Sequence, residues 1–306
     1  MDRQKVLAIV GPTGIGKTSL SVWLAKQLDG EIISCDSMQV YKKMDIGTAK
    51  VTQEEMQGIH HELIDVQNYN EPYNVKVFQE KCRTAIEDVV KRGKFPILCG
   101  GTGLYLKAAL YDYEFQEENE DIAYTTFLNS KTNEELVAML KEKDEKALEK
   151  IHPNNRKRLI RALQICHSGT SKSEQEDKQQ HIPLYDVYFL GLDVNREILH
   201  DRINKRVDIM FENGLVKEVE DLFTNPETWE YTSFQGIGYK EFKDYFLKEK
   251  SIDEVKTAIK THSRQYAKRQ YTWFKNQMPV HWFEAQNRDE IYSACLLYTS
   301  DAADEL

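Results

Sequence analysis

The sequence predicts an α/β fold in which a parallel sheet is flanked by helices and interrupted by a helical insertion. Three observations support this prediction. Short apolar runs alternate with helical patterns through much of the chain, which is typical of strand–helix–strand units. The first run, KVLAIV, leads directly into the glycine-rich stretch GPTGIGKT. A charged segment in the middle of the chain carries no strand pattern.

Each strand is expected where a short apolar run is bounded by turn residues. These runs lie at residues 5–10, 31–35, 61–66, 95–99 and 184–194. Helices are expected at 17–28, 74–92, 195–212, 214–224, 236–249 and 251–277, and after the GGTG turn at 100–103. Two of them have clear end signals. Asn74 is a plausible N-cap with Gly93 as the stop, and Ser251 and Glu254 have the spacing of a capping box.

The charged segment at 113–182 is expected to form the helical insertion, because stretches such as TNEELVAMLKEKDEKALEK are helical in composition. Residues 1–112 and 183–306 would then form one discontinuous catalytic core. The final stretch, 295–306, continues no pattern. We expect it to be disordered and to be non-native sequence.

The composition narrows the class of protein. With 306 residues, 41% of them hydrophobic, the chain can bury a sizeable core. Lys and Arg number 41 against 50 Asp and Glu, so the net charge gives no general attraction to nucleic acid. The five cysteines lack disulfide or zinc spacing, which indicates free thiols in the cytoplasm. No apolar run reaches the ~18 residues of a membrane span. We expect a cytoplasmic monomer that does not cross a membrane.

The stretch GPTGIGKT matches the spacing G-x-x-x-x-G-K-[ST] of a phosphate-binding P-loop. It follows a strand and opens a helix, so the core is expected to be P-loop NTPase-like. Backbone N–H groups and the helix dipole would attract a polyphosphate. Lys17 would add a positive charge, and the hydroxyl of Thr18 would be a ligand of Mg²⁺. The predicted phosphate-binding residues are Gly11, Pro12, Thr13, Gly14, Ile15, Gly16, Lys17 and Thr18.

Asp36 ends the second predicted strand, at the sheet edge that also carries the P-loop. Its carboxylate could accept a proton from an incoming nucleophile. It could equally be a turn or helix cap, because Asp followed by Ser is also typical of caps. Position alone leaves both interpretations open.

Arg202 and Arg206 lie four residues apart on one predicted helix, so both guanidinium groups fall on one face. They could clamp a leaving phosphate, or they could form an ordinary solvated face. The adjacent His60 and His61 have no metal-binding pattern, and we interpret them as structural.

Two basic clusters stand out against the acidic total: RKRLIR at 156–161 and KTHSRQYAKRQYTWFK at 260–275. The second interleaves basic residues with Tyr266, Tyr271 and Trp273. Such a stripe would suit an RNA backbone and stacked bases. The alternative is a core-facing aromatic stripe with a solvated basic back.

Taken together, several motifs resemble one family. GPTGIGKT, DSMQVYKKMDIGTAK (36–50), HHELIDV (60–66) and GGTGLYL (100–106) occur in this order. IHPNNRKRLIRAL (151–163), RVDIMFENGLVKEV (206–219), QGIGYKE (235–241) and AKRQYTWFK (267–275) follow. Over roughly residues 5 to 283 the chain resembles the bacterial tRNA dimethylallyltransferases, also called tRNA isopentenyltransferases.

The resemblance implies transfer of a dimethylallyl group from dimethylallyl diphosphate to N6 of adenosine 37 in tRNA, with release of diphosphate. The P-loop would hold the diphosphate although the motif alone indicates ATP. Asp36 would take the proton of the amino group. Lys17, Mg²⁺ on Thr18 and Arg206 would stabilise the leaving group, and Thr102 would lie in the reaction channel.

The resemblance also implies contacts to the anticodon stem-loop, with the insertion embracing the stem. Two departures from the family pattern are Gly14-Ile15 in the loop and an acidic start of the insertion at 111–127. The implied tRNA-binding residues are Asp36, Ser37, Met38, Gln39, Thr102, Lys157, Arg158, Leu159, Ile160, Arg161, Gln235, Gly236, Ile237, Gly238, Tyr239, Lys240, Lys268, Arg269, Gln270 and Lys275.

Two other classes of function remain as alternatives. A P-loop small-molecule kinase would also place an Asp after its second strand, but it does not account for the insertion and the two basic clusters. An RNA-binding protein gated by a nucleotide would not need Lys17, Thr18, Asp36 and Arg206 together.

Overall fold

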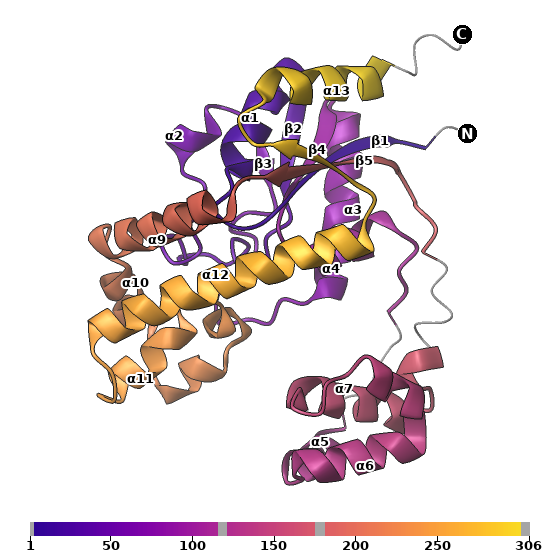
Figure 1. The fold of residues 1–306 in the computed structure, drawn as a ribbon, viewed down its shortest axis with the longest axis vertical. Helices are drawn as coiled ribbons and strands as arrows, with labels where there is room; N and C mark the ends of the chain where they lie inside the picture. Colours follow the sequence, from indigo (N-terminus) through magenta and orange to yellow (C-terminus); the bar gives the residue numbers. More distant parts are fainter. Residues whose placement is uncertain (1–2, 116–120, 175–180, 301–306) are drawn as a thin grey trace. The chain divides into compact units, whose positions relative to one another are not determined.

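The computed structural model describes residues 3–115, 121–174 and 181–300 (Figure 1). The chain divides into two compact units, one made of Met1–Tyr111 with Pro183–Leu306 and the other of Asp112–Ile182. We refer to them as the core unit and the insertion unit. No helix among the described residues is both long enough and apolar enough to span a membrane.

The core unit is built on one parallel sheet, which confirms the predicted α/β fold. The strand order is β3-β2-β4-β1-β5-β6, and β1 lies between β4 and β5. Val10 at the end of β1 pairs with Gly100 of β4 and Gly191 of β5, so the loops that follow β1 and β4 start at one edge. The strands are β1 (Lys5–Val10), β2 (Gly30–Ser34), β3 (His61–Glu62), β4 (Phe95–Gly100), β5 (Asp186–Asp193) and β6 (Val280–Glu284).

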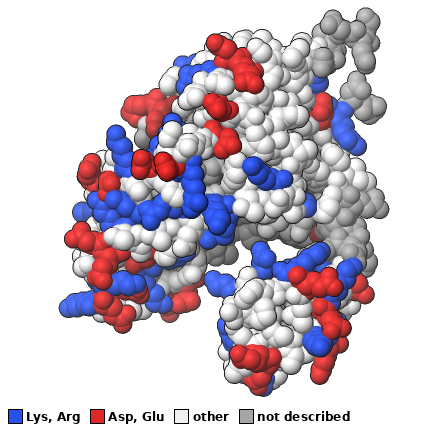
Figure 2. All heavy atoms as spheres, viewed as in Figure 1, with Lys and Arg blue, Asp and Glu red and all other residues white. Residues whose placement is uncertain are grey.

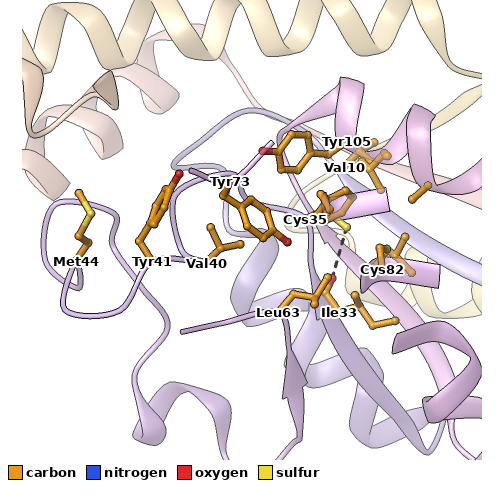
Figure 3. Close-up of a cluster of buried hydrophobic side chains, with 14 of the residues drawn as sticks. Val10, Ile33, Cys35, Val40, Tyr41, Met44, Leu63, Tyr73, Cys82 and Tyr105 are labelled. Atoms are coloured by element: carbon orange, nitrogen blue, oxygen red, sulfur yellow. Dashed lines mark hydrogen bonds between the residues drawn. The ribbon is translucent and has the colours of Figure 1, made fainter. Parts of the chain in front are cut away.

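Helices cover both faces of this sheet because strand side chains alternate between the faces. Leu7 and Ile9 pack towards α1 and α13, whereas Val6, Ala8 and Val10 pack towards the other face. Figure 3 shows part of this second cluster. The helices are α1 (Lys17–Gln27), α2 (Gln53–Met56), α3 (Val75–Lys91), α4 (Gly103–Leu110), α9 (Arg196–Glu212), α10 (Leu215–Leu222), α11 (Lys243–Phe246), α12 (Ile252–Gln277) and α13 (Arg288–Ser300).

The predicted helix ends at Asn74 and Ser251 are confirmed. The Asn74 side chain accepts a hydrogen bond from Val77 N–H at the start of α3. Ser251 and Glu254 form a capping box at the start of α12. α12 runs for 26 residues and packs against α9 and α4, so it crosses the same edge of the sheet as the glycine-rich loop (Figure 1).

The predicted helix at 236–249 is wrong. The segment forms a 3-10 turn at Lys240–Phe242 and the short helix α11. Gly238 has a φ of +101°, and a side chain there would meet the carbonyl oxygen of Gly47 at 2.9 Å. The chain therefore turns at Gly238 because it packs closely against another loop, which local helical composition does not reveal.

Two further expectations also fail. β6 lies outside the predicted strands, and its sequence VHWFE mixes apolar with polar residues. The expected disorder at 295–306 is wrong for residues 295–300, which belong to α13. Cys295 is buried, and the Tyr298 hydroxyl donates to the carbonyl of Asp186 and accepts from Val6 N–H. Residues 301–306 lie outside the described residues.

The insertion unit is helical, and the part of it that the structure describes contains no strand. Its core is a cluster of leucines that includes Leu128, Leu136, Leu140, Leu159 and Leu163. The elements are α5 (Ile122–Asn129), α6 (Asn133–Asp144), a 3-10 helix (Glu145–Glu149) and α7 (Arg156–His167).

Within the core unit, one carboxylate fixes the loop that follows Met44. Glu218 on α10 accepts the backbone N–H groups of Asp45, Ile46 and Gly47 at 2.7–3.0 Å. It also accepts the hydroxyl of Tyr239, which is fully buried, at 2.7 Å. A side chain at Gly47 would come within 2.6 Å of the Tyr239 ring. The loop and Tyr239 are therefore held as one block.

We expect Glu218→Ala to lower the free energy of unfolding by about 3 kcal/mol, because it leaves a buried hydroxyl and three N–H groups without their acceptor. Urea denaturation measures this change. Glu220→Ala is the matched control, since Glu220 is exposed on the same helix and should shift stability by less than about 0.5 kcal/mol. Equal effects of the two substitutions would contradict this interpretation.

Candidate active site

The loop from Gly11 to Gly16 connects β1 to α1, and its Thr13 N–H donates to the Gln270 side chain at 2.9 Å. Gly14 and Gly16 have φ values of +80° and +106°, conformations that glycine adopts readily. Gly16 is the N-cap of α1, and no side chain caps this end. The helix terminus is therefore open to a negatively charged group.

Lys17 directly follows this loop and is held by it. Its ammonium donates to the carbonyls of Gly11 and Pro12 at 3.0 and 2.8 Å. Burial lowers the pKa of Lys17 to about 8, while Cys99 and Asp36 act in the opposite sense and Arg206 adds to the lowering. An incoming polyanion would replace the lost solvation and stabilise the charged form.

Both arginines of α9 reach the same loop. The Arg206 guanidinium donates to the Thr13 hydroxyl at 3.1 Å, and Arg202 donates to the Ile15 carbonyl at 3.3 Å. Burial lowers the pKa of Arg206, although Asp36 partly opposes this effect. The two side chains therefore contact the loop instead of forming a merely solvated face.

Asp36 caps a turn with one of its carboxylate oxygens, and its proton-acceptor role stays a prediction. Its Oδ1 accepts the backbone N–H groups of Met38 and Gln39 at 2.8 and 3.3 Å, as a turn cap does. Among the described residues no group donates to Oδ2, and the side chain borders the cavities described next. One oxygen thus fixes the loop and the other is available to a ligand.

Two cavities of different character adjoin this loop. The first, about 260 Å³, is lined by Lys17, Thr18 and Ser34 together with the loop backbone. The second, about 510 Å³, has an apolar wall that includes Met210 and Ile237. The residues that line both are Thr13, Asp36, Arg206 and Tyr266.

Thr102 and Tyr266 face the second cavity from different elements. Thr102 is the N-cap of α4, but its side chain makes no capping bond and interacts with the Tyr266 side chain instead. Tyr266, on α12, was considered from sequence only as a stacking or core aromatic. Its place between the two cavities depends on α12 crossing the sheet edge, which no local signal in the sequence indicates.

The implied tRNA-binding residues fall into separate groups. Many line the second cavity, while three side chains lie in the interior: Leu159, Tyr239 and Gln270. Gln270 accepts from Thr13 N–H and donates to the Gly101 carbonyl, so its amide is engaged within the protein. We leave these three out of the proposed RNA surface. Those lining the cavity are Ser37, Met38, Thr102, Gln235, Gly236, Ile237, Lys240 and Arg269.

Basic side chains gather along α12 in Figure 2. Two of them share one counter-charge, since Lys256 and Lys260 both pair with Asp208 at 2.7 Å. Lys268 is exposed and forms no ion pair with any residue that the structure describes. It shares a shallow groove with Arg269 and Trp273. Lys157, Arg158, Ile160 and Arg161 lie on α7 of the insertion unit.

One cluster outside the cavities has metal-binding groups. Glu31, His60 and Glu62 approach one another, but the Arg92 guanidinium bonds Glu31 and Glu62 at 2.6 and 2.9 Å. An arginine thus already provides the counter-charge. Thr18 fits Mg²⁺ better, because its hydroxyl borders the first cavity at the phosphate-binding loop and Mg²⁺ prefers oxygen ligands.

His61 also borders the first cavity, which the sequence did not indicate. Its Nδ1 bonds the Ile59 carbonyl at 2.9 Å, and burial lowers its pKa. Its Nε2 is buried without a hydrogen-bond partner among the described residues. Because Nδ1 donates to that carbonyl and the lowered pKa favours the neutral ring, Nε2 is an acceptor without a partner.

Fold and site together define a class of protein: a parallel α/β protein with a glycine-rich loop at the start of α1 and a carboxylate that lines both the cavity at this loop and a second, more apolar cavity. Residues 39–277 match the family described as IPP transferase. The chain belongs to this family.

Individual relatives agree with this assignment. The chain is 49% identical to the tRNA dimethylallyltransferase of Bacillus anthracis, over 95% of this chain and 94% of that protein. Among solved structures, it is similar to the tRNA isopentenylpyrophosphate transferase of Bacillus halodurans, with 40% identity, 98% coverage of each chain and a TM-score of 0.75. It is also similar to a eukaryotic dimethylallyltransferase acting on tRNA, with 31% identity, a TM-score of 0.83 and coverage of 99% of this chain and 80% of that one.

We expect inorganic diphosphate, used as a probe, to bind more weakly as the pH rises through about 8, because Lys17 then loses its charge. Calorimetric titration between about pH 7 and about pH 10 should show affinity falling by up to about tenfold per pH unit. Lys17→Arg is the control, because a guanidinium stays protonated in this range. The same pH dependence in both proteins would exclude the Lys17 proton as its cause.

Proposed function

We propose that this protein is a tRNA dimethylallyltransferase, which transfers a dimethylallyl group from dimethylallyl diphosphate to N6 of adenosine 37 in tRNA and releases diphosphate. The observation that carries the proposal is the pair of joined cavities, one polar at the glycine-rich loop and one apolar, with Asp36 lining both. The names of the similar proteins support the same reaction.

The polar cavity suits the diphosphate of the donor. Loop N–H groups, Lys17 and Arg206 would bind its oxygens and stabilise the charge that grows on them as the C1–O bond breaks. Thr18 would hold Mg²⁺, which supplies further charge stabilisation to a diphosphate when bound. No phosphorus–oxygen bond to an acceptor needs to form.

The apolar cavity suits the allylic group and the adenine. The N6 lone pair would form a bond to C1 while the electrons of the C1–O bond leave with the diphosphate. N6 then carries an excess proton, which the Oδ2 atom of Asp36 would accept. Since Oδ1 is held by Met38 and Gln39 N–H groups, the carboxylate is already oriented for this step.

The anticodon loop would reach the second cavity past α12. Adenosine 37 is unpaired in the loop, so moving it out of its stack requires less free energy than in a duplex. Lys268, Arg269 and Lys275 would contact phosphates, and α7 of the insertion unit would contact the stem with Lys157, Arg158 and Arg161. We also propose that the protein acts as a monomer in the cytoplasm.

The apolar wall of the second cavity favours prenyl transfer over the alternative of a small-molecule kinase. A kinase would hold a polar acceptor there, whereas Ile203, Val207 and Met210 line this cavity from α9. A dimethylallyl group can bury its apolar surface against these side chains, whereas a polar metabolite gains nothing from them.

The direct test is to incubate the protein with labelled dimethylallyl diphosphate, Mg²⁺ and an unmodified tRNA that has adenosine at positions 36 to 38. We expect label in the tRNA, and we expect Asp36→Asn to slow its incorporation by roughly 10²- to 10⁴-fold. The amide keeps an acceptor for the turn but cannot take the proton.

Binding of the same tRNA by Asp36→Asn is the control and should stay near that of the wild type. Transfer at the wild-type rate by the variant would refute the role of Asp36. Absence of transfer by the wild type, with ATP-dependent phosphorylation of a metabolite, would instead establish the kinase.

We expect Lys268→Ala to weaken tRNA binding and to reduce the slope of log affinity against log salt by about one, because one phosphate contact and its released counterion are lost. Filter binding at several salt concentrations measures the slope. Lys91→Ala is the matched control, since Lys91 lies on α3 and pairs with Asp88. An unchanged slope would remove Lys268 from the RNA surface.

A further inference from the structure

The junction of the two cavities locates the reacting carbon. The diphosphate would lie in the first cavity and the acceptor in the second, so the bond that breaks must lie where they meet. The residues that line both are Thr13, Asp36, Arg206 and Tyr266. The set includes Tyr266, which has no role in the transfer chemistry proposed above.

Three of these residues already have other partners or proposed roles. The Thr13 hydroxyl accepts from Arg206, and Arg206 would bind the leaving diphosphate. Asp36 would receive the proton of the nucleophile. Tyr266 is the aromatic ring of the set and is neutral, because burial and nearby Asp36 raise the pKa of its hydroxyl to about 12.

The carbon at the junction must become more positive as its bond to oxygen lengthens. Lys17 and Arg206 favour departure of the diphosphate, but their charges oppose positive charge on the carbon left behind. The face of an aromatic ring attracts a cation and does not react with it. The Tyr266 ring already has a cation over its face, because the Arg269 guanidinium lies 5.7 Å from its centroid.

We propose that Tyr266 is a catalytic residue whose ring stabilises positive charge on the allylic carbons during transfer and excludes water from them. This proposal rests on the proposed dimethylallyl transfer. As the C1–O bond breaks, its electron pair leaves with the diphosphate, and the N6 lone pair forms the new bond. Water in place of N6 would give dimethylallyl alcohol, diphosphate and a released proton.

The hydroxyl of Tyr266 is assigned a different task. It interacts with the side chains of Thr102 and Gln270, and Gln270 in turn holds the loop through Thr13 N–H at 2.9 Å. These neighbours place the hydroxyl beside the loops that follow β1 and β4. The ring and the hydroxyl can therefore be separated by substitution, since phenylalanine keeps the first and lacks the second.

The experiment compares Tyr266→Phe with Tyr266→Leu at saturating tRNA and donor. Both the label transferred to tRNA and the dimethylallyl alcohol released are measured. We expect Tyr266→Phe to stay within about threefold of the wild-type rate. Tyr266→Leu should slow transfer roughly tenfold and raise the ratio of alcohol to modified tRNA. Tyr271→Leu, the same change further along α12, should leave that ratio unchanged.

The outcomes separate the two proposals. Without transfer by the wild type, the proposed function itself fails. With wild-type transfer, an unchanged rate and ratio in Tyr266→Leu would overturn the role of Tyr266. Equal losses in Tyr266→Phe and Tyr266→Leu would also overturn it, because the hydroxyl would then be the active group. Binding of inorganic diphosphate by each variant shows whether the first cavity is intact.

A second series of variants at position 266 keeps the proposal testable if Tyr266→Leu does not fold. Phenylalanine with an increasing number of ring fluorines is placed at position 266, which weakens the attraction of the ring for a cation with little change in shape. We expect the transfer rate to fall with each fluorine added. A rate that is independent of fluorination would overturn the proposal.

Discussion

The site depends on one side-chain amide. Gln270, on α12, accepts from Thr13 N–H and donates to the Gly101 carbonyl, and it is almost completely buried. The first bond holds the glycine-rich loop after β1, and the second holds the loop after β4. A side chain at Gly101 would come within 2.1 Å of the Gln270 nitrogen. This close approach sets α12 against the sheet edge and so brings Tyr266 beside Asp36.

The charges at this edge are arranged for an anion that the protein itself does not supply. Lys17 and Arg206 both have pKa values lowered by burial, and Asp36 offsets this only in part. The folded state therefore holds the Lys17 proton less tightly than the unfolded state, where the pKa is near 10.5. The contribution of Lys17 to the free energy of unfolding consequently rises as the pH increases from about 8 towards 10.5. At neutral pH the charged lysine opposes folding, and a bound diphosphate would relieve this.

The local signals in the sequence predict those parts of the site that depend on one element. The glycine-rich loop, Asp36 at the end of β2 and the helix start at Ser251 follow from spacing and capping chemistry. Local patterns do not reveal the tasks of Gln270 and Tyr266, which arise where α12 meets loops more than 150 residues earlier in the chain. The turn at Gly238 and the packing of α13 were misjudged for the same reason, because contacts distant in sequence override local composition.

Both cavities belong to one of the two units of the chain. Every residue that lines them lies before Tyr111 or after Pro183, and therefore in the core unit. The insertion unit has its own leucine core and presents basic residues on α7 that would bind RNA. On this division, the core unit holds the groups that break and form bonds, and substitutions on α7 would change the affinity for tRNA without moving those groups. The second cavity is walled by α9 and α12 together with the loops that follow β2 and precede α11. Because phosphate contacts position an RNA without reading its bases, selection among tRNAs would fall to the side chains of the core unit that line this cavity.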